Sequence, residues 1–136
     1  MATIESLEDI QAWTVARQLN AEIYRITRLG GFARDFALRD QIRRASLSIM
    51  LNIAEGFERG GNAEFRQFLA IAKGSSGEVR SALYAALDAE FIDHVQFQTL
   101  SDLTKHVSRL ISGFIRYLSN TEKRGHKFRP DDNDST

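Results

Sequence analysis

Hydrophobic positions recur every three or four residues along four long stretches of the chain, which is the spacing that lines one face of an α-helix. Ser6 precedes the first stretch as a candidate helix cap, and Gly30 follows it as a stop. Glu8 and Asp9 carry the negative charge that favours a helix N-terminus. The pattern therefore predicts a first helix between Ser6 and Gly30, and its apolar row is Ile10, Trp13, Ala16, Leu19, Ile23 and Ile26.

The second stretch predicts a helix from about Phe36 to Glu55, with Gly56 as its stop. Its core row is Leu38, Ile42, Ala45, Ile49 and Ile53. The C-terminal half of this helix is apolar around most of its circumference, which is more surface than one neighbouring helix covers. We therefore expect burial on two sides, and the predicted oligomer interface is Leu47, Met50, Leu51 and Ala54.

The third stretch follows a glycine-rich connection and predicts a helix capped by Asn62. Gly74 and Gly77 fall inside this helix, where each glycine costs about 1 kcal/mol relative to alanine. A close approach by another helix would compensate for this cost, and a local kink is the alternative interpretation. The core row of this helix is Phe65, Leu69, Ala72, Ser76, Val79, Leu83 and Ala86.

The fourth stretch has the clearest periodicity, and it begins with Asp93 and Gln96 in the spacing of a capping box. Its core row is Leu100, Leu103, Val107, Leu110, Phe114 and Leu118. The chain beyond this row is polar and contains the only proline, Pro130, so residues 121–136 are expected to form a disordered tail. The predicted folded domain is residues 1–120.

Helices of similar length joined by short connections favour an all-α fold, an antiparallel up-down-up-down four-helix bundle. No segment alternates with the period of two that a half-buried β-strand shows. A chain of 136 residues with 43% hydrophobic residues suits a single domain with one core.

The composition also restricts the compartment that we expect. The chain has no cysteine, which suits a reducing environment, and its first residues lack the basic and apolar regions of a secretory signal. The longest strongly apolar run, Ala45 to Ala54, is far shorter than the roughly 20 residues that cross a membrane. We expect a soluble, cytoplasmic protein with no membrane partner.

The net charge of zero hides an uneven distribution of charge along the chain. Three of the 18 acidic residues, Asp131, Asp132 and Asp134, lie in the last six positions. Without them, 18 basic residues face 15 acidic ones, so the rest of the chain is mildly basic at a formal charge of +3.

The chain shows no recognisable catalytic or metal-binding motif. Glu-x-x-His pairs, which build di-iron sites in helix bundles, are absent, and the nearest patterns are Glu90 with His94 and Asp102 with His106. Two ligands are too few for a typical metal site, and solvated polar pairs explain the same spacing. The chain also lacks a nucleophile elbow and a Walker-type phosphate loop. We expect no enzymatic activity, no metal and no cofactor.

Rows of cations are the most informative charged pattern. Arg66, Lys73 and Arg80 recur every seven residues and would form a stripe about 21 Å long on one helix. Arg39 and Arg43 share a face of the preceding helix, and Arg44 is adjacent. Such rows are suited to a phosphate backbone, and the alternative is a solvated surface paired with acids such as Asp40, Glu64 and Glu78.

The central part of the chain carries a specific run of residues: Asp40-Gln41-Ile42-Arg43-Arg44-Ala45-Ser46, Ser48-Ile49, Asn52-Ile53-Ala54-Glu55-Gly56, Glu64-Phe65, Phe68-Leu69 and Ile71-Ala72-Lys73-Gly74-Ser75. This run resembles the bacterial four-helix-bundle family first known as proteins encoded within intervening sequences of large-subunit ribosomal RNA genes. The resemblance covers Leu7 to about Leu118. It implies an up-down bundle that assembles as a homopentameric ring without enzymatic activity. Distant relatives are accessory proteins of diversity-generating retroelements, in which a basic pentamer engages nucleic acid and a reverse transcriptase.

The sequence departs from the family pattern at Met50, where relatives commonly have proline, and at Ser76-Gly77, where a larger apolar residue is usual. Asn52, Glu55 and Gly56 match the family motif. We interpret them as structural residues that orient one another or the turn at Gly56, because neither polar residue has a catalytic companion.

These observations lead to the hypothesis of a non-enzymatic, homo-oligomeric bundle that binds RNA or another nucleic acid. The binding residues expected are Arg39, Arg43, Arg44, Arg66, Lys73 and Arg80. The alternative is a protein-interaction scaffold or accessory subunit with no direct nucleic-acid role, whose basic surfaces contact an acidic protein.

Overall fold

The computed structural model describes residues 3–123, and this part of the chain contains helices and no strand. A short 3-10 helix, η1 (Leu7–Asp9), is followed by α1 (Gln11–Ile26), α2 (Gly30–Arg34), α3 (Phe36–Arg59), α4 (Asn62–Asp88) and α5 (His94–Lys123). The expected all-α class is confirmed, and α2 is an additional helix that the periodicity did not predict. Most of the predicted tail, residues 124–136, lies outside the described residues, whereas its first three residues continue α5.

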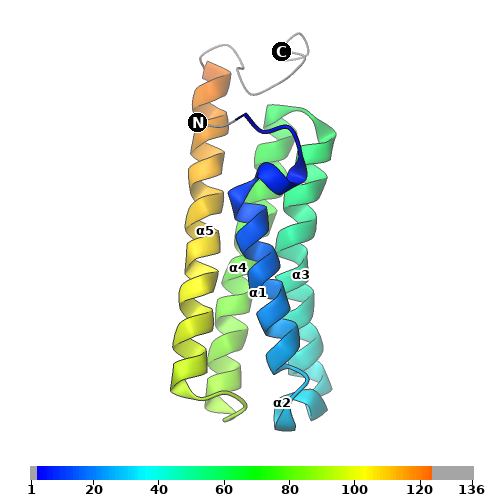
Figure 1. Cartoon of the computed structure of the whole chain (residues 1–136), viewed down its shortest axis with the longest axis vertical. Coiled ribbons are helices and arrows are strands. Elements are labelled where there is room, and N and C mark those ends of the chain that lie inside the picture. Colours follow the sequence, from blue (N-terminus) through cyan, green and yellow to red (C-terminus); the bar gives the residue numbers. More distant parts are fainter. Residues whose placement is uncertain (1–2, 124–136) are drawn as a thin grey trace.

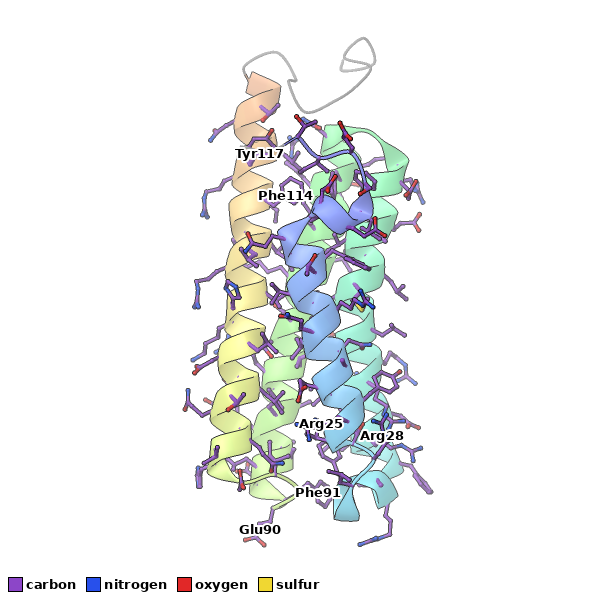
Figure 2. All side chains as sticks on the ribbon, in the orientation of Figure 1. Arg25, Arg28, Glu90, Phe91, Phe114 and Tyr117 are labelled. Carbon is purple, nitrogen blue, oxygen red and sulfur yellow. The ribbon has the colours of Figure 1, made fainter. Side chains whose placement is uncertain are left out.

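The four long helices lie lengthwise beside one another, and the chain reverses direction from each to the next (Figure 1). α3 contacts α1 and α4, and α5 contacts α4 and α1, so each long helix packs against two neighbours. The short α2 lies at one end of this bundle. There Phe32 of α2 stacks on Phe91 of the α4–α5 turn at 5.4 Å between ring centroids, and Figure 2 places Phe91 at the same end.

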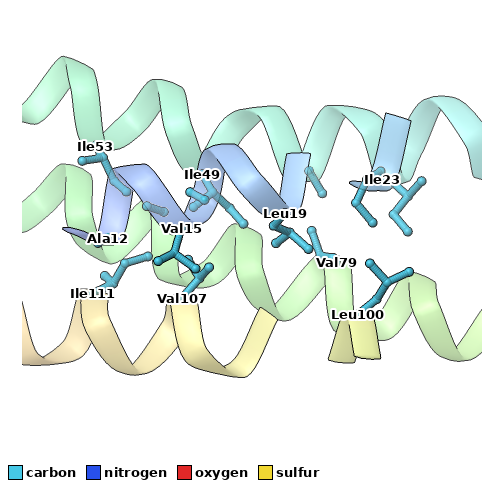
Figure 3. Close-up of a cluster of buried hydrophobic side chains, with 14 of the residues drawn as sticks. Ala12, Val15, Leu19, Ile23, Ile49, Ile53, Val79, Leu100, Val107 and Ile111 are labelled. Atoms are coloured by element: carbon cyan, nitrogen blue, oxygen red, sulfur yellow. The ribbon is translucent and has the colours of Figure 1, made fainter. Parts of the chain in front are cut away.

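Side chains from all four long helices fill the interior (Figure 3). The predicted apolar rows supply this core: Leu19 and Ile23 from α1, Ile49 from α3 and Val107 from α5 are fully buried. The rows differ from the prediction mainly at their edges, where residues such as Trp13 are only partly buried. Within residues 3–123, no helix combines the length and the apolar character needed to cross a membrane.

The start of the first helix differs from the prediction. Ser6 precedes the 3-10 turn η1, and α1 itself begins only at Gln11. The Asp9 carboxylate accepts hydrogen bonds from the backbone amides of Glu5 at 2.9 Å and Ser6 at 3.0 Å, which lowers the pKa of Asp9. The acidic residues expected at the helix start therefore fold the segment that precedes it.

Gly56 is not the stop of the second helix, so that prediction is wrong. α3 continues to Arg59 and ends at Gly60, whose φ of 86° is the left-handed conformation that glycine adopts without strain. Gly56 is instead buried where α3 meets α4. A Cβ atom at this position would lie 2.7 Å from the Cδ1 atom of Phe65 and 2.9 Å from the Cβ atom of Phe68. Close packing therefore explains the glycine.

The α4 boundary and its internal glycines also need correction. Gly61 precedes the first residue of α4, and Asn62 is fully buried within the helix instead of capping it. α4 runs unbroken through Gly74 and Gly77, so neither glycine ends the helix. Within residues 3–123, no atom of another helix lies within 4 Å of a Cβ atom placed at either glycine, so the expected close approach is not made there.

The start of the fourth helix is confirmed. The amide of Asp93 donates to the Oε1 atom of Gln96 at 3.0 Å, and the amide of Gln96 donates to the Oδ1 atom of Asp93 at 2.7 Å. This reciprocal pair is the predicted capping box. α3 likewise runs without a break through Met50, where family members commonly carry proline.

We predict that Gly56→Ala lowers the free energy of unfolding by about 1–3 kcal/mol, because the added methyl group overlaps Phe65 and Phe68. Gly77→Ala is the matched control, since its methyl group meets open space and alanine favours a helix by about 1 kcal/mol. Urea denaturation at one fixed protein concentration measures both changes. Equal effects of the two substitutions would contradict the packing role of Gly56.

Candidate nucleic-acid interface

The predicted stripe on α4 is present as one row of cations. Lys73 and Arg80 are exposed and Arg66 is half-buried. Tyr84, four residues after Arg80, continues the row, and its ring lies 4.8 Å from that of Phe97 on α5. Because side chains three or four residues apart share a helix face, this contact places the whole row beside α5.

α5 adds a fourth cation to this surface. Lys105 is eight residues after Phe97 and therefore lies on the same face of α5, and it is half-buried. At the other end of the two helices, Phe65 contacts Phe114 at 5.1 Å between centroids, so α4 and α5 stay adjacent over this length. We name Arg66, Lys73, Arg80 and Lys105 the α4–α5 cationic surface.

α5 also carries the half-buried Ser108 and Ser112, three and seven residues after Lys105. Glu78 lies on another face of α4, and Asp102, three residues before Lys105, accepts a hydrogen bond from Gln98 at 2.9 Å. Within residues 3–123, Lys73, Arg80 and Lys105 make no ion pair. Cations and hydroxyls are the groups that proteins use to contact phosphates.

The predicted arginines of α3 are placed differently, because two of them bind their own chain. Arg43 donates from Nε to the Oγ1 atom of buried Thr27 at 2.8 Å, and its guanidinium carbon lies 4.6 Å from the ring centroid of Tyr24. Arg39 donates to the carbonyl of Ala33 at 3.0 Å. These arginines therefore join α3 to α1 and α2.

Arg39 also pairs with Asp40 at 2.9 Å, which agrees with the alternative interpretation that these cations are paired with acids on a solvated surface. Arg44 is exposed, and its contact in the described chain is a 3.4 Å hydrogen bond to Gln41. The six predicted binding residues therefore do not form one surface. The α4 residues face α5, whereas Arg39 and Arg43 face α2 and α1.

The predicted oligomer interface is partly exposed. Leu51 has 56% of its surface exposed, and Leu47, Met50 and Ala54 are intermediate. The exposed Ile71 of α4 lies close to Leu51, because the hydroxyl groups of Ser48 and Ser75 are 2.8 Å apart and fix the register of the two helices. We name Leu47, Leu51 and Ile71 the α3–α4 apolar surface.

The motif residues Asn52, Glu55 and Gly56 contact different partners. The Nδ2 atom of Asn52 donates to the carbonyl and hydroxyl oxygens of Ser48, both at 2.9 Å. Glu55 accepts from Arg59 at 2.8 Å, and this hydrogen bond raises the pKa of the Arg59 guanidinium. The three residues thus support α3 and its packing on α4 at separate points.

Neither of two clefts on the described part of the chain brings together a catalytic group of residues. One, of about 470 Å³, lies between the start of α1 and α5, where Phe114 and Tyr117 are seen in Figure 2. Its one carboxylate, Asp9, is held by backbone amides. The other lies at the α4–α5 turn and contains exposed carboxylates and His94. Within residues 3–123, no three His, Cys, Asp or Glu side chains are grouped to hold a metal ion.

Sequence reasoning missed a second group of cations at the α2 end of the bundle. Arg28 and Arg34 are exposed there, and Figure 2 shows Arg25 and Arg28 close to this end. Phe36, the first residue of α3 and two residues after Arg34 in sequence, is 64% exposed. The signal was present in the sequence as a high density of arginine between residues 25 and 44.

Comparisons with known proteins agree with the fold. A family model described as 23S rRNA-intervening sequence protein matches residues 8–113. A crystal structure of a protein with unknown function from the S23 ribosomal protein family of Bacteroides thetaiotaomicron superposes with a TM-score of 0.70. It is 21% identical and covers 77% of this chain and 98% of its own. No curated protein matches the chain.

We predict that Arg43→Ala lowers the free energy of unfolding by about 1 kcal/mol, because it removes a charged hydrogen bond and a cation–π contact. Arg44→Ala removes the same charge from an exposed neighbour and should change stability by less than about 0.5 kcal/mol. Urea denaturation of both variants at equal concentration distinguishes them. An equal loss in both would show that Arg43 is not a structural residue.

Proposed function

The chain belongs to the family of 23S rRNA-intervening sequence proteins, and from this premise we propose that it is a non-enzymatic, homo-oligomeric protein that binds RNA or another nucleic acid. In this proposal the antiparallel four-helix bundle is the subunit of a cytoplasmic ring. The number five for the ring is taken from the family resemblance, since nothing in one subunit specifies it.

The α4–α5 cationic surface is the observation that carries the proposal. Its cations follow the helix axis over about 21 Å, a length that matches several phosphate groups of a nucleic-acid strand. A solvated surface without a binding role would normally intersperse acids among its cations. Here Glu78 lies on another face of α4 and Asp102 is engaged by Gln98, and the half-buried Arg66 and Lys105 lose less conformational freedom on binding than fully exposed side chains.

Assembly would strengthen this binding. One subunit presents four cations, whereas a closed ring repeats them around its axis and raises the local positive potential although each chain is neutral. The α3–α4 apolar surface supports assembly, since Leu51 and Ile71 leave apolar area uncovered.

The Arg66→Glu, Lys73→Glu and Arg80→Glu triple variant should abolish binding to single-stranded and duplex oligonucleotides and retain its helicity. Wild-type affinity should fall steeply with salt, because bound phosphates release counterions. Fluorescence anisotropy across a salt series measures both effects.

The matched control reverses the exposed Arg17, Arg44 and Arg59 on α1 and α3, which changes the net charge by the same amount. This control variant should still bind, and the slope of its affinity against salt concentration should be at least half that of the wild type. Equal losses in both triple variants would mean that only net charge matters. Absence of wild-type binding even at low salt would overturn the proposal and favour the scaffold that contacts an acidic protein.

For assembly, we predict that Leu51→Glu converts the oligomer into a monomer, because a carboxylate would be buried between subunits. Light scattering coupled to size exclusion measures the mass. Val95→Glu is the control, since Val95 is 74% exposed at the start of α5, away from the α3–α4 apolar surface. A monomeric wild type, or an unchanged mass in Leu51→Glu, would refute this interface.

A further inference from the structure

The end of the bundle that carries α2 combines free arginines with an exposed aromatic ring. From residue 22 to residue 44 the chain has six arginines and three acids. Each acid is already engaged: Glu22 pairs with Arg25, Asp40 pairs with Arg39, and Asp35 accepts the amide of Leu38 at 2.9 Å. Within residues 3–123, Arg28 and Arg34 make no ion pair. This segment therefore has an excess of positive charge, whereas the α4–α5 turn at the same end of the bundle carries the exposed acids Asp88, Glu90 and Asp93.

Phe36 is held rigidly in an exposed position. Asp35 caps α3 and makes Phe36 its first residue, so the backbone beneath the ring is fixed. The guanidinium carbon of Arg39 lies 4.7 Å from the ring centroid, and Arg39 is itself fixed by Ala33 and Asp40. The guanidinium covers one face of the ring, and 64% of the residue remains exposed.

The other exposed aromatic residue in the described chain is used differently. Tyr84 is 54% exposed, but its ring packs on Phe97 and joins α4 to α5. Phe36 belongs neither to the buried core nor to the side chains packed against it. Its exposed ring is therefore available to a partner from solution.

We propose that the α2 end binds the unpaired bases of a single-stranded nucleic acid, with a base stacked on Phe36 and flanking phosphates bound by Arg28 and Arg34. This inference rests on the proposed nucleic-acid-binding function and adds the strand type that it prefers. Aromatic rings beside cations are how proteins hold single strands, because every base presents a stacking face. In a duplex these faces are stacked inside the helix and cannot reach Phe36.

Charge decides between this partner and an apolar protein surface. A protein that covered Phe36 would also have to cover two unpaired arginines, which requires acids at matching positions. A single strand supplies a phosphate beside every base, so the same ligand satisfies the ring and both cations. The exposed Leu29 adds apolar surface next to them.

The experiment compares Phe36→Leu with Phe36→Trp in the full-length protein. Leucine keeps apolar surface but removes the stacking face, whereas tryptophan keeps the stacking face. Anisotropy is measured with a single-stranded RNA and with a duplex of the same sequence. Phe36→Leu should bind the single strand about tenfold more weakly and leave duplex affinity unchanged. Phe36→Trp should bind the single strand at least as tightly as the wild type.

A 2-aminopurine base in the single strand provides a direct readout of stacking. Its fluorescence should fall on binding to the wild type and to Phe36→Trp, and should not fall on binding to Phe36→Leu. Val95→Ala, a change at a more exposed apolar residue, is the control and should behave as the wild type. Unfolding curves confirm that each variant is folded.

Equal single-strand affinity and equal quenching in Phe36→Leu and the wild type would overturn the inference and leave the α4–α5 cationic surface as the binding site. Parallel loss of single-strand and duplex affinity in Phe36→Leu would also overturn it, because stacking would not be responsible. If the wild type bound no oligonucleotide, the proposed function itself would fail. These outcomes are distinguishable in one set of titrations.

Discussion

The close packing of α3 on α4 is the constraint on which the rest of this structure depends. Gly56 lets the two helices approach until Phe65 and Phe68 occupy the space of a side chain. Further along, Ser48 meets Ser75 through their hydroxyls, and Asn52 holds Ser48 in place. These two contacts, at Gly56 and at Ser48–Ser75, determine the register of α3 and α4 and the rotation of each helix about its axis. The faces that α4 presents to its other neighbours follow from this rotation.

The rotation of α4 places its cationic row beside α5 and its glycines toward solvent. Phe65 packs on Gly56 from one side and on Phe114 of α5 from another. The residues one position further round the helix, Arg66 and its repeats Lys73 and Arg80, then border the α4–α5 junction. A substitution that moved the two helices apart would therefore also displace the proposed binding surface. Asn52, Glu55 and Gly56 of the family motif support the site through geometry and supply none of its cations.

Periodicity predicted which residues form the core, because burial of one helix face leaves a repeated signal in the sequence. It failed at the glycines. Gly56 and Gly60 look alike in the sequence, yet Gly56 is needed for close packing and Gly60 for a left-handed turn. Only the position of the partner helix distinguishes these two causes. The prediction that Asn62 caps the helix failed for a similar reason, since its burial is decided by the helices that enclose the start of α4. The short α2 was missed because one helical turn carries almost no periodicity.

The candidate site was predictable only in part, because charge in a sequence does not reveal which cations are already engaged. Arg43 and Arg44 are adjacent, yet one is bound to Thr27 and Tyr24 whereas the other is exposed.

The glycines of α4 are a second case in which the sequence does not reveal which groups a residue contacts. Gly74 and Gly77 destabilise the helix by about 1 kcal/mol each, and among residues 3–123 no side chain and no other helix comes within 4 Å of a Cβ atom placed at either position. Gly74, three residues after Ile71, borders the α3–α4 apolar surface, where a second subunit packed on α4 would compensate for this cost. Gly77, four residues after Lys73, lies instead on the α4–α5 cationic surface. The proposed assembly thus accounts for the outward Gly74 and the adjacent α3–α4 apolar surface, which the isolated bundle leaves unexplained.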